Sequence, residues 1–371
     1  MHKKYMRLAL ELAEKAKGRT SPNPLVGAVI VKNGEIVGQG HHLMAGTPHA
    51  EIHAIRDAGE SATGAALYVT LEPCSHFGRT PPCCNAVIKA GITEVYVAMQ
   101  DPNPLVAGRG IKQMKDAGIT VHVGLMEEHT RRMNEIFIKY ITERMPFVLL
   151  KTAMSLDGKI ATRTGHARWV TGDAARSVVH ELRNEYDAIL VGINTVLSDN
   201  PALTCRLPEG GRDPIRIVLD SQARTPVDSQ ILIQESGAST YIVVTDKAPF
   251  ERIKLLSAGK AKILRVSADK QGKVNLAELL DKLGQMEITG LLVEGGAEVA
   301  ASFLEEGLID KMLAFIAPKI VGGASSLSPV GGQGIDNMEQ AIKLVRTGFG
   351  QIGEDFFIEG YPRYLQDKKD D

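Results

Sequence analysis

The sequence predicts an α/β protein with two domains. A chain of 371 residues is long enough for two or three separate hydrophobic cores. Apolar stretches with helical and strand periodicity alternate along it, and a break at residues 142–146 precedes a new apolar strand that begins at Phe147. We therefore expect a first domain over residues 1–145 and a second domain over residues 146–371.

Helices and strands alternate in the first part. A helical stripe of apolar residues covers 6–16, and a near-continuous apolar strand covers 25–31. Asn33-Gly34 then predicts a tight hairpin turn into a strand over 36–40. The remaining pattern predicts helices over 49–58, 83–90, 109–117 and 127–142, and strands over 67–71, 94–99 and 119–123. Such a series predicts a sheet with helices on both faces.

Three candidate zinc ligands lie in this part of the chain. His49 opens the triplet His49-Ala50-Glu51, and Cys74 and Cys83 lie downstream of it. Structural zinc sites are normally closed by four protein ligands, whereas a site with three protein ligands keeps a bound water. The zinc ion lowers the pKa of that water to about 7. We expect one Zn²⁺ per chain at these three residues, with hydroxide available at neutral pH.

Glu51 lies two residues from His49, near the metal without needing to bind it. A carboxylate there can carry protons between the water and a departing amine. His-x-Glu followed by two cysteines is typical of zinc deaminases, so Glu51 is the expected catalytic acid and base. Both halves of the site should lie at helix N-termini, whose positive ends stabilise thiolates and hydroxide.

The cysteines also admit a purely structural interpretation as packed thiols or disulfides. Catalytic zinc is favoured because three of the four cysteines fall close together, beside a proline and downstream of His-x-Glu. Cys83 and Cys84 are adjacent, and successive helical residues point about 100° apart, so only one should face the metal. Cys205 lies in a distant polar stretch, and we assign it no role.

Composition restricts the partners. The chain has 43 basic and 44 acidic residues, a net charge of −1, and no dense run of lysine and arginine. This argues against a nucleic-acid substrate and favours a small molecule. No apolar run approaches the roughly eighteen residues of a membrane span, and the N-terminus lacks an apolar signal core. We therefore expect a cytoplasmic protein with no membrane partner.

The cysteine spacing departs from the usual P-C-x-x-C pattern, because eight residues separate Cys74 from Cys83. A glycine and two prolines in this insertion allow a rigid loop that returns the second thiolate to the metal. Gly-Arg-Thr-Pro-Pro-Cys, together with Asn-Pro-Leu-Val-Gly at 23–27 and Asp-Pro-Asn-Pro at 101–104, resembles the deaminase half of bifunctional riboflavin-biosynthesis deaminase/reductases. This resemblance implies a cytidine-deaminase-like α/β/α domain.

The second part resembles the reductase half of the same family. The match rests on Lys-Thr-Ala-Met-Ser-Leu-Asp-Gly-Lys-Ile-Ala at 151–161, Trp-Val-Thr at 169–171, and segments 191–195 and 199–204. Both resemblances together cover nearly the whole chain, in the order of the bacterial fusion. They imply a C-terminal dihydrofolate-reductase-like α/β domain.

The residues themselves supply a phosphate-binding pattern in this part. An apolar strand over 290–293 runs into Glu294-Gly295-Gly296-Ala297 and a helix that ends near Glu305. Glycines at a strand-to-helix turn let the backbone approach a phosphate, and the positive helix end favours its charge. A Gly-Gly turn is more often a simple chain reversal, and no G-x-G-x-x-G is present, so the resemblance carries the prediction of NADPH binding.

The resemblance also implies the residues of the reductase site. Lys151 is expected near the ribose carbon that is reduced. The nicotinamide cofactor is expected to contact Ala153, Trp169, Thr195, Asp199, Ser221, Gly296, Ala297, Glu298, Val299, Ala300, Ala301 and Ser302. The substrate is expected to contact Ala167, Arg183, Leu203, Arg206 and Glu294.

Two features of these substrate positions follow from chemistry. Arginine suits a phosphoribosyl group because its planar fork binds phosphate through two bonds, although a solvated surface charge is an equal alternative for any one arginine. Position 167 is alanine, where some relatives carry a hydroxyl residue. A contact through the backbone of Ala167 would preserve the interaction.

In the deaminase half, the positions that match the binding of base and ribose phosphate are Asn23, His42, Arg79, Asp101 and Asn103. A surface histidine at the end of a strand is an equal alternative for His42. Because His41 adjoins it, only one of the two can face inward.

Together with the zinc-deaminase pattern, the resemblance implies a bifunctional enzyme of riboflavin biosynthesis. Zinc hydroxide would deaminate 2,5-diamino-6-(5-phosphoribosylamino)pyrimidin-4(3H)-one, and NADPH would reduce the ribosyl group to give 5-amino-6-(5-phosphoribitylamino)uracil. We expect a homo-oligomer. Two alternatives remain: a deaminase of another base or nucleotide fused to an unrelated reductase, and a zinc-stabilised binding protein with vestigial sites. The presence of Glu51 argues against the second, because zinc could bind without it.

Overall fold

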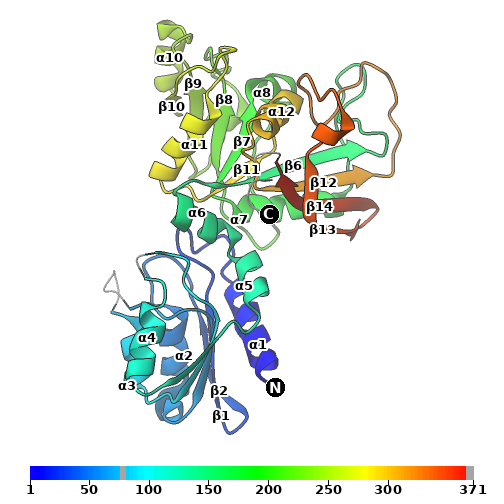
Figure 1. The fold of residues 1–371 in the computed structure, drawn as a ribbon. Coiled ribbons are helices and arrows are strands. Elements are labelled where there is room, and N and C mark those ends of the chain that lie inside the picture. The colour runs from blue at the N-terminus through cyan, green and yellow to red at the C-terminus, as the bar shows by residue number, and fades with distance from the viewer. Residues whose placement is uncertain (76–80, 105, 365–371) are drawn as a thin grey trace. The chain divides into compact units, whose positions relative to one another are not determined.

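The computed structural model describes residues 1–75, 81–104 and 106–364. The chain divides into two compact units, Met1–Met145 and Pro146–Asp371, each with its own β-sheet. In Figure 1 the first unit runs from blue to blue-green and the second from green to red. In the part of the chain that the structure describes, no helix is long and apolar enough to cross a membrane.

A five-stranded mixed sheet forms the centre of the first unit. Its strands are β1 (Gly27–Lys32), β2 (Glu35–His41), β3 (Ala66–Leu71), β4 (Glu94–Met99) and β5 (Thr120–Val123). They lie in the order β2-β1-β3-β4-β5, with antiparallel pairing on both sides of β1 and parallel pairing from β3 to β5. The predicted hairpin turn is confirmed, because Asn33 and Gly34 have the positive φ values, 55° and 85°, that a two-residue turn needs.

Helices cover both faces of this sheet (Figure 1). They are α1 (His2–Glu14), α2 (Ala50–Ala58), α3 (Cys83–Lys89), α4 (Arg109–Asp116), α5 (Glu127–Met133) and α6 (Glu135–Glu143), with a 3-10 turn η1 (Gly59–Ala62) after α2. Met6 and Ala9 of α1 pack against one face of the sheet. Ala54 of α2, Val87 of α3 and Met114 of α4 belong to the core on the other face. The predicted α/β/α layering is confirmed.

The helix predicted over 127–142 is wrong in one respect, because it is two helices, α5 and α6, that meet at Asn134. The side chain of Asn134 accepts a hydrogen bond from the backbone N–H of Leu25 at 2.8 Å and donates one to the Leu25 carbonyl at 3.0 Å. This buried pairing with a distant segment fixes Asn134 outside helical geometry, at φ −110° and ψ 20°. Periodicity alone carries no signal for such a long-range contact.

Two glycines of β2 allow α2 to lie directly on the sheet. A β-carbon on Gly38 would lie 2.3 Å from the carbonyl oxygen of Ala54, and one on Gly40 would lie 2.7 Å from the carbonyl oxygen of Ala50. Both distances are too short for a carbon–oxygen contact. The position of α2 therefore depends on the absence of side chains at these two positions.

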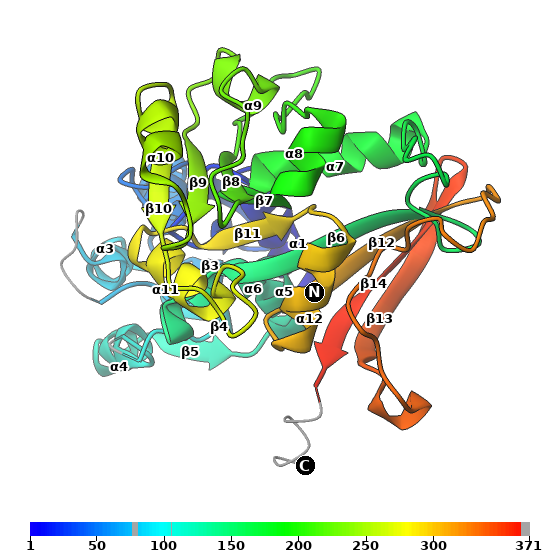
Figure 2. The same cartoon turned by 90° about the horizontal axis from the view of Figure 1, so that it is seen from above.

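A nine-stranded sheet forms the second unit. Its strands are β6 (Phe147–Ser155), β7 (Ala188–Gly192), β8 (Ile215–Leu219), β9 (Thr240–Val244), β10 (Ala261–Arg265), β11 (Gly290–Val293), β12 (Lys311–Ala317), β13 (Lys343–Ile352) and β14 (Asp355–Arg363). The order is β10-β9-β8-β7-β11-β6-β12-β14-β13. The first seven are parallel, and β14 is antiparallel to both of its neighbours. Figure 2 shows β12, β14 and β13 side by side.

The helices of this unit connect its parallel strands. They are α7 (Asp173–Glu185), α8 (Ile193–Asp199), α9 (Gln230–Ile233), α10 (Phe250–Ser257), α11 (Leu276–Gln285) and α12 (Ala297–Glu305), with a 3-10 turn η2 (Met338–Gln340) before β13. All four residues of β11 are buried, as expected for a central strand covered on both faces. In open α/β sheets ligands bind at the carboxyl ends of the parallel strands, and α8 and α12 begin at that edge, after β7 and β11.

Candidate active sites

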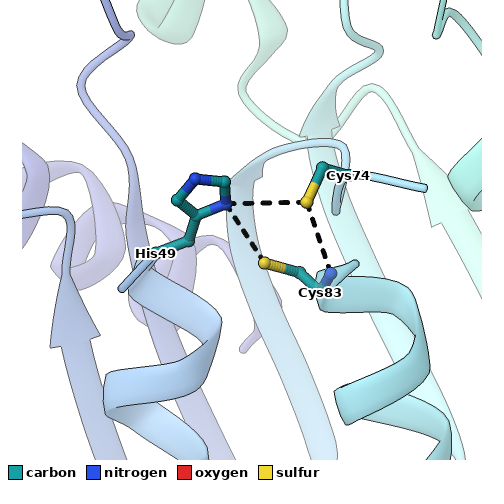
Figure 3. Close-up of side chains that lie close together, drawn as sticks. All are labelled: His49, Cys74 and Cys83. Atoms are coloured by element: carbon teal, nitrogen blue, oxygen red, sulfur yellow. Dashed lines mark hydrogen bonds between the residues drawn. The ribbon is translucent and has the colours of Figure 1, made fainter. Parts of the chain in front are cut away.

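The three predicted zinc ligands lie together in the first unit. His49 is the residue before α2, Cys83 is the first residue of α3, and Cys74 follows β3. The Nδ1 atom of His49 lies 3.2 Å from the Cys83 sulfur and 3.6 Å from the Cys74 sulfur. Figure 3 shows the three side chains pointing toward one another.

These distances fit a tetrahedral zinc ion. Zinc bonds of about 2.0–2.1 Å to nitrogen and 2.3 Å to sulfur separate the two ligand atoms by roughly 3.5 Å. The ligand atoms of His49, Cys74 and Cys83 all lie within 4.8 Å of one another. Hydrogen bonds from Cys83 and His49 lower the pKa of Cys74 to about 4 although burial opposes the shift, which favours the thiolate that binds a metal.

Glu51 lies in the first turn of α2 and is 3% exposed. Burial raises its pKa to about 7, while the neighbouring His49 acts in the opposite direction. Its Oε2 atom is buried and has no hydrogen-bond partner among the described residues. A buried carboxylate oxygen that is left unpaired beside the ligands is available to a polar molecule in the open coordination position.

His42 faces inward, so its interpretation as a surface histidine is wrong. The side chain is 2% exposed, its Nδ1 lies 3.3 Å from the carbonyl oxygen of Pro48, and its ring lies edge-on to that of His49 at 5.3 Å. An N–H at Nδ1 that donates to Pro48 leaves Nε2 to accept from the amide of Asn23, at 3.1 Å. Asn23 and His42 are thus brought together beside a zinc ligand.

Asp101 and Asn103 lie in the segment between β4 and α4, where Asp101 accepts a hydrogen bond from the backbone N–H of Asn103 at 2.9 Å. This segment is held by Glu72, a residue that the sequence interpretation missed. The buried carboxylate of Glu72 accepts backbone N–H bonds from Asp101, Gly108, Gly110 and Ile111 at 2.9–3.2 Å. Its place directly before Pro-Cys was the only available signal.

Two further predictions in this unit have different outcomes. Cys84 is fully buried in the core and its thiol donates to Gln113 at 3.0 Å, so of the adjacent cysteines only Cys83 belongs to the metal cluster. Arg79, predicted to bind substrate, lies outside the described residues. Cys205 lies in the second unit. No role was assigned to it, and its thiol lies 3.5 Å from the carbonyl oxygen of His180.

The second unit contains a cavity of about 760 Å³ at the carboxyl edge of its sheet. Most of the predicted cofactor and substrate residues line it: Lys151, Ala153, Ala167, Trp169, Arg183, Thr195, Asp199, Arg206, Ser221, Glu294, Gly296, Ala297, Glu298, Val299, Ala300 and Ser302. Leu203 and Ala301 do not line it. They are 5% and 3% exposed, and Ala301 is one of the buried residues of α12.

The glycines after β11 bring the backbone close to the neighbouring strand. A β-carbon on Gly295 would lie 2.9 Å from the Cα atom of Val191 in β7, so no side chain fits there. Gly296 has φ +62° and immediately precedes α12. The positive end of a nine-residue helix therefore opens into the cavity without an intervening side chain, which suits a phosphate.

Glu294 is the centre of a buried ionic cluster. Arg183 donates from Nε and Nη2 to its two carboxylate oxygens at 2.7 and 3.0 Å, and the ammonium of Lys151 lies 3.1 Å from Oε2. Burial by itself raises the pKa of Glu294, but Arg183 and Lys151 overcome this effect and lower it to about 2. The carboxylate is therefore ionised and holds Lys151 at the cavity wall.

Arg206 and Trp169 are more accessible. The guanidinium of Arg206 lies 3.4 Å from Nε2 of His180, another residue of the cavity wall. Trp169 is 62% exposed, and the guanidinium of Arg176 lies 4.6 Å from the centre of its ring. Both side chains present surface to the cavity that a ligand can cover.

Comparison with known proteins agrees with both sites. Residues 1–99 match the cytidine and deoxycytidylate deaminase zinc-binding region, and residues 146–358 match the RibD C-terminal domain. The riboflavin biosynthesis protein RibD of Aquifex aeolicus is 47% identical over 96% of this chain and 97% of that protein. The structure of Acinetobacter baumannii RibD superposes with a TM-score of 0.86 at 37% identity, over 98% of this chain and 99% of that one.

A similar match is found for a Thermotoga maritima protein described as a diaminohydroxyphosphoribosylaminopyrimidine deaminase/5-amino-6-(5-phosphoribosylamino)uracil reductase. Its TM-score is 0.84 at 37% identity, with coverage of 98% of this chain and 99% of that one. The fold and the two sites thus define a zinc-dependent deaminase joined to an NADPH-dependent reductase. The chain belongs to the RibD family and is a bifunctional enzyme of riboflavin biosynthesis. The alternative of an unrelated reductase is therefore wrong.

Proposed function

We propose that residues 1–145 deaminate 2,5-diamino-6-(5-phosphoribosylamino)pyrimidin-4(3H)-one and that residues 146–371 reduce the product to 5-amino-6-(5-phosphoribitylamino)uracil. The observation that carries this proposal is the cluster of His49, Cys74 and Cys83 beside the buried Glu51. The other unit of the same chain has a cavity at which a helix begins directly after a glycine. The Thermotoga relative, which matches nearly the whole chain, is named for these two reactions.

In the first unit, His49, Cys74 and Cys83 would hold Zn²⁺. The ion, when bound, lowers the pKa of a coordinated water to about 7 and supplies hydroxide to the ring carbon that carries the 2-amino group. Glu51 accepts the proton of the water and delivers it to departing ammonia, a role supported by its unpaired Oε2. Asn23, His42, Asp101 and Asn103 orient the base and ribose phosphate, together with Arg79 outside the described residues.

In the second unit, the backbone at Gly296 and the start of α12 receive the cofactor phosphates. NADPH supplies the hydride that reduces C1′ of the ribosyl group. The cofactor site is completed by five further residues, a placement supported by their position on the cavity wall: Ala153, Trp169, Thr195, Asp199 and Ser221. Residues 297–302 of α12 contribute the remaining cofactor contacts. Within this stretch Ala301 contributes indirectly, because its side chain is buried behind the residues that line the cavity.

Lys151 is proposed as the proton donor to the ring oxygen that is released when the sugar opens. Its ammonium is held by Glu294 at 3.1 Å and lines the cavity. Arg206 and the backbone of Ala167 contact the substrate directly. Arg183 and Glu294 contribute through the buried cluster, and Leu203 through packing behind the wall.

The experiment supplies the diaminopyrimidine to the full chain and measures ammonia release and NADPH oxidation separately. Both should occur, and NADPH oxidation should depend on prior deamination. Cytidine is the matched control, because it offers the same kind of exocyclic amine without the phosphoribosyl group. Turnover of cytidine without action on the diaminopyrimidine would contradict the substrate assignment.

We further propose a homo-oligomer in the cytoplasm with no nucleic-acid or membrane partner. Phe349 of β13 lies opposite Ile358 of β14, and with Phe356 these side chains form an exposed apolar face, with Phe349 86% exposed. Four unpaired cysteines suit a reducing compartment, and the balanced charge is unlike that of a nucleic-acid binder. Sedimentation of the wild type and Phe349→Asp tests the oligomer: a purely monomeric wild type would contradict it.

A further inference from the structure

The order of the strands gives the cofactor a direction across the reductase cavity. At the carboxyl edge, β8 leads to Ser221, β11 leads to Gly296, and β6 carries Lys151. Neighbouring strands lie about 4.8 Å apart, so β8 and β6, three spacings apart, are separated by roughly 14 Å. If the phosphates lie at Gly296 and the nicotinamide faces Lys151, the adenosine must extend toward β8. This direction rests on the cofactor placement proposed above.

The turn that follows β8 is fixed by hydrogen bonds on both sides of Arg224. The carboxylate of Asp220 accepts bonds from the backbone N–H and the hydroxyl of Thr225, both at 2.7 Å. The guanidinium of Arg252 in α10 donates to the carbonyls of Ala223 at 2.9 Å and Thr225 at 2.7 Å. The residues before and after Arg224 are therefore held, so its side chain leaves the protein from a rigid position.

The guanidinium of Arg224 itself has little to bind. Its side chain is 48% exposed and lines the cavity, and its charged neighbour among the described residues is Asp220, at 3.7 Å. Lys273 lines the same cavity in the segment before α11. Its side chain is 50% exposed, and its ammonium lies 3.6 Å from Glu298. Exposed pairs at such distances are weak, so both cations keep donors for a ligand.

We propose that Arg224 and Lys273 bind the 2′-phosphate on the adenosine ribose of NADPH and thereby select it over NADH. A phosphate monoester carries about 1.5 to 2 negative charges at neutral pH, and arginine binds it through two bonds. Sites for NADH instead present a carboxylate to the ribose hydroxyls. The carboxylate that directly follows β8, Asp220, is 0% exposed, accepts hydrogen bonds within its own turn and does not line the cavity.

The test measures equilibrium binding of NADPH and NADH to the full chain by calorimetry, without substrate. Arg224→Ala and Lys273→Ala should each weaken NADPH binding by about tenfold to a hundredfold, the range for a lost hydrogen bond to a charged group. Their affinity for NADH should change by less than about threefold, which also shows that the cavity is intact. Lys270→Ala is the matched control, because it removes an exposed charge three residues from Lys273 and outside the cavity wall.

Two fragments separate the phosphate contact from the rest of the cofactor. The wild type should bind 2′,5′-ADP more tightly than 5′-AMP, and Arg224→Ala should abolish the difference. Equal weakening of NADPH and NADH, or unchanged NADPH binding in both variants, would overturn the assignment while leaving the proposed cofactor site in place. A wild type that binds neither dinucleotide would instead overturn the cofactor placement itself.

Discussion

Arg183 and Glu294 form a buried ion pair in which two guanidinium nitrogens donate to the two carboxylate oxygens, at 2.7 and 3.0 Å. A third nitrogen of Arg183 donates to the carbonyl of Thr204 at 3.2 Å. The planar fork that could bind a substrate phosphate is thus already engaged by protein. Of the two arginines predicted to bind substrate, Arg206 is exposed and is the one available for direct contact with the substrate phosphate.

Arg183→Ala should therefore act mainly on stability. Removal of one partner from a buried ion pair costs about 3–5 kcal/mol, and we expect the lower end because Lys151 still faces Glu294. Denaturant unfolding measures the loss. Arg206→Ala is the control, because an exposed arginine should contribute under about 0.5 kcal/mol while its loss raises the Michaelis constant of the reductase. Equal stability losses in the two variants would contradict the division of roles.

The same pair predicts an acid-dependent stability. An unfolded glutamate has a pKa of about 4.3, whereas Arg183 and Lys151 hold the pKa of Glu294 at about 2 in the folded protein despite burial. The stabilisation is fully present above about pH 4.3 and is lost as the pH falls toward about 2. Between these values the free energy of unfolding should fall less steeply in Glu294→Gln than in the wild type. Parallel curves would show that Glu294 is not the group responsible.

Zinc content should distinguish the two adjacent cysteines. Cys83→Ser should strip the metal, because its sulfur lies 3.2 Å from the His49 nitrogen, whereas Cys84→Ser should keep one zinc per chain, because its thiol is in the core. Metal analysis of the purified variants gives the result. Zinc loss in Cys84→Ser with retention in Cys83→Ser would move the ligand assignment by one residue.

Glu51→Gln should strongly reduce deamination and leave the reduction step unaffected. The amide keeps the size of the side chain but cannot accept the proton of the water, so ammonia release should fall by about 10²–10⁴. Zinc content should be unchanged. NADPH oxidation should stay near that of the wild type when the already deaminated pyrimidinedione is supplied. A folded, zinc-loaded variant that loses both activities equally would show that the two reactions share a site.

Glu72→Ala should weaken the first unit and its substrate binding. The substitution leaves four backbone N–H groups without their acceptor, each at a cost of about 1 kcal/mol or more. We expect the unfolding free energy to fall by about 3 kcal/mol and the Michaelis constant for deamination to rise, because the segment with Asp101 and Asn103 loosens. Glu60→Ala, at an exposed position, serves as the control. Unchanged kinetics in a destabilised variant would limit Glu72 to a structural role.

Much of the local structure was predictable because it depends on short-range signals. The hairpin at Asn33-Gly34 and the helix starts at His49 and Cys83 follow from residues adjacent in sequence. The break at Asn134 was missed because its cause, a pair of hydrogen bonds to Leu25, joins positions 109 residues apart. Hydrophobic periodicity contains no information about such a partner.

The sites likewise combine features that the sequence predicts with features that only the folded chain shows. The spacing of His49, Cys74 and Cys83 predicted a cluster that the structure brings together. Glu72 and Arg224 could not be predicted from the sequence, because single charged residues are common. Only the folded chain shows that Glu72 accepts hydrogen bonds from four backbone amides and that Arg224 extends from a fixed turn toward the cavity. Arg183 was predicted to bind phosphate because a sequence shows its guanidinium but does not show the carboxylate that engages it.

The packing of α2 on Gly38 and Gly40 has a consequence for how freely the chain can vary. These glycines carry no functional atom, yet any side chain there would push on the backbone of the helix that follows His49 and contains Glu51. A genetic screen for lost deamination with reductase function retained should therefore recover substitutions at Gly38 and Gly40 alongside those at the ligands. The substitutions that this enzyme tolerates are therefore limited as much by the strand residues on which α2 packs as by the functional groups at the start of that helix.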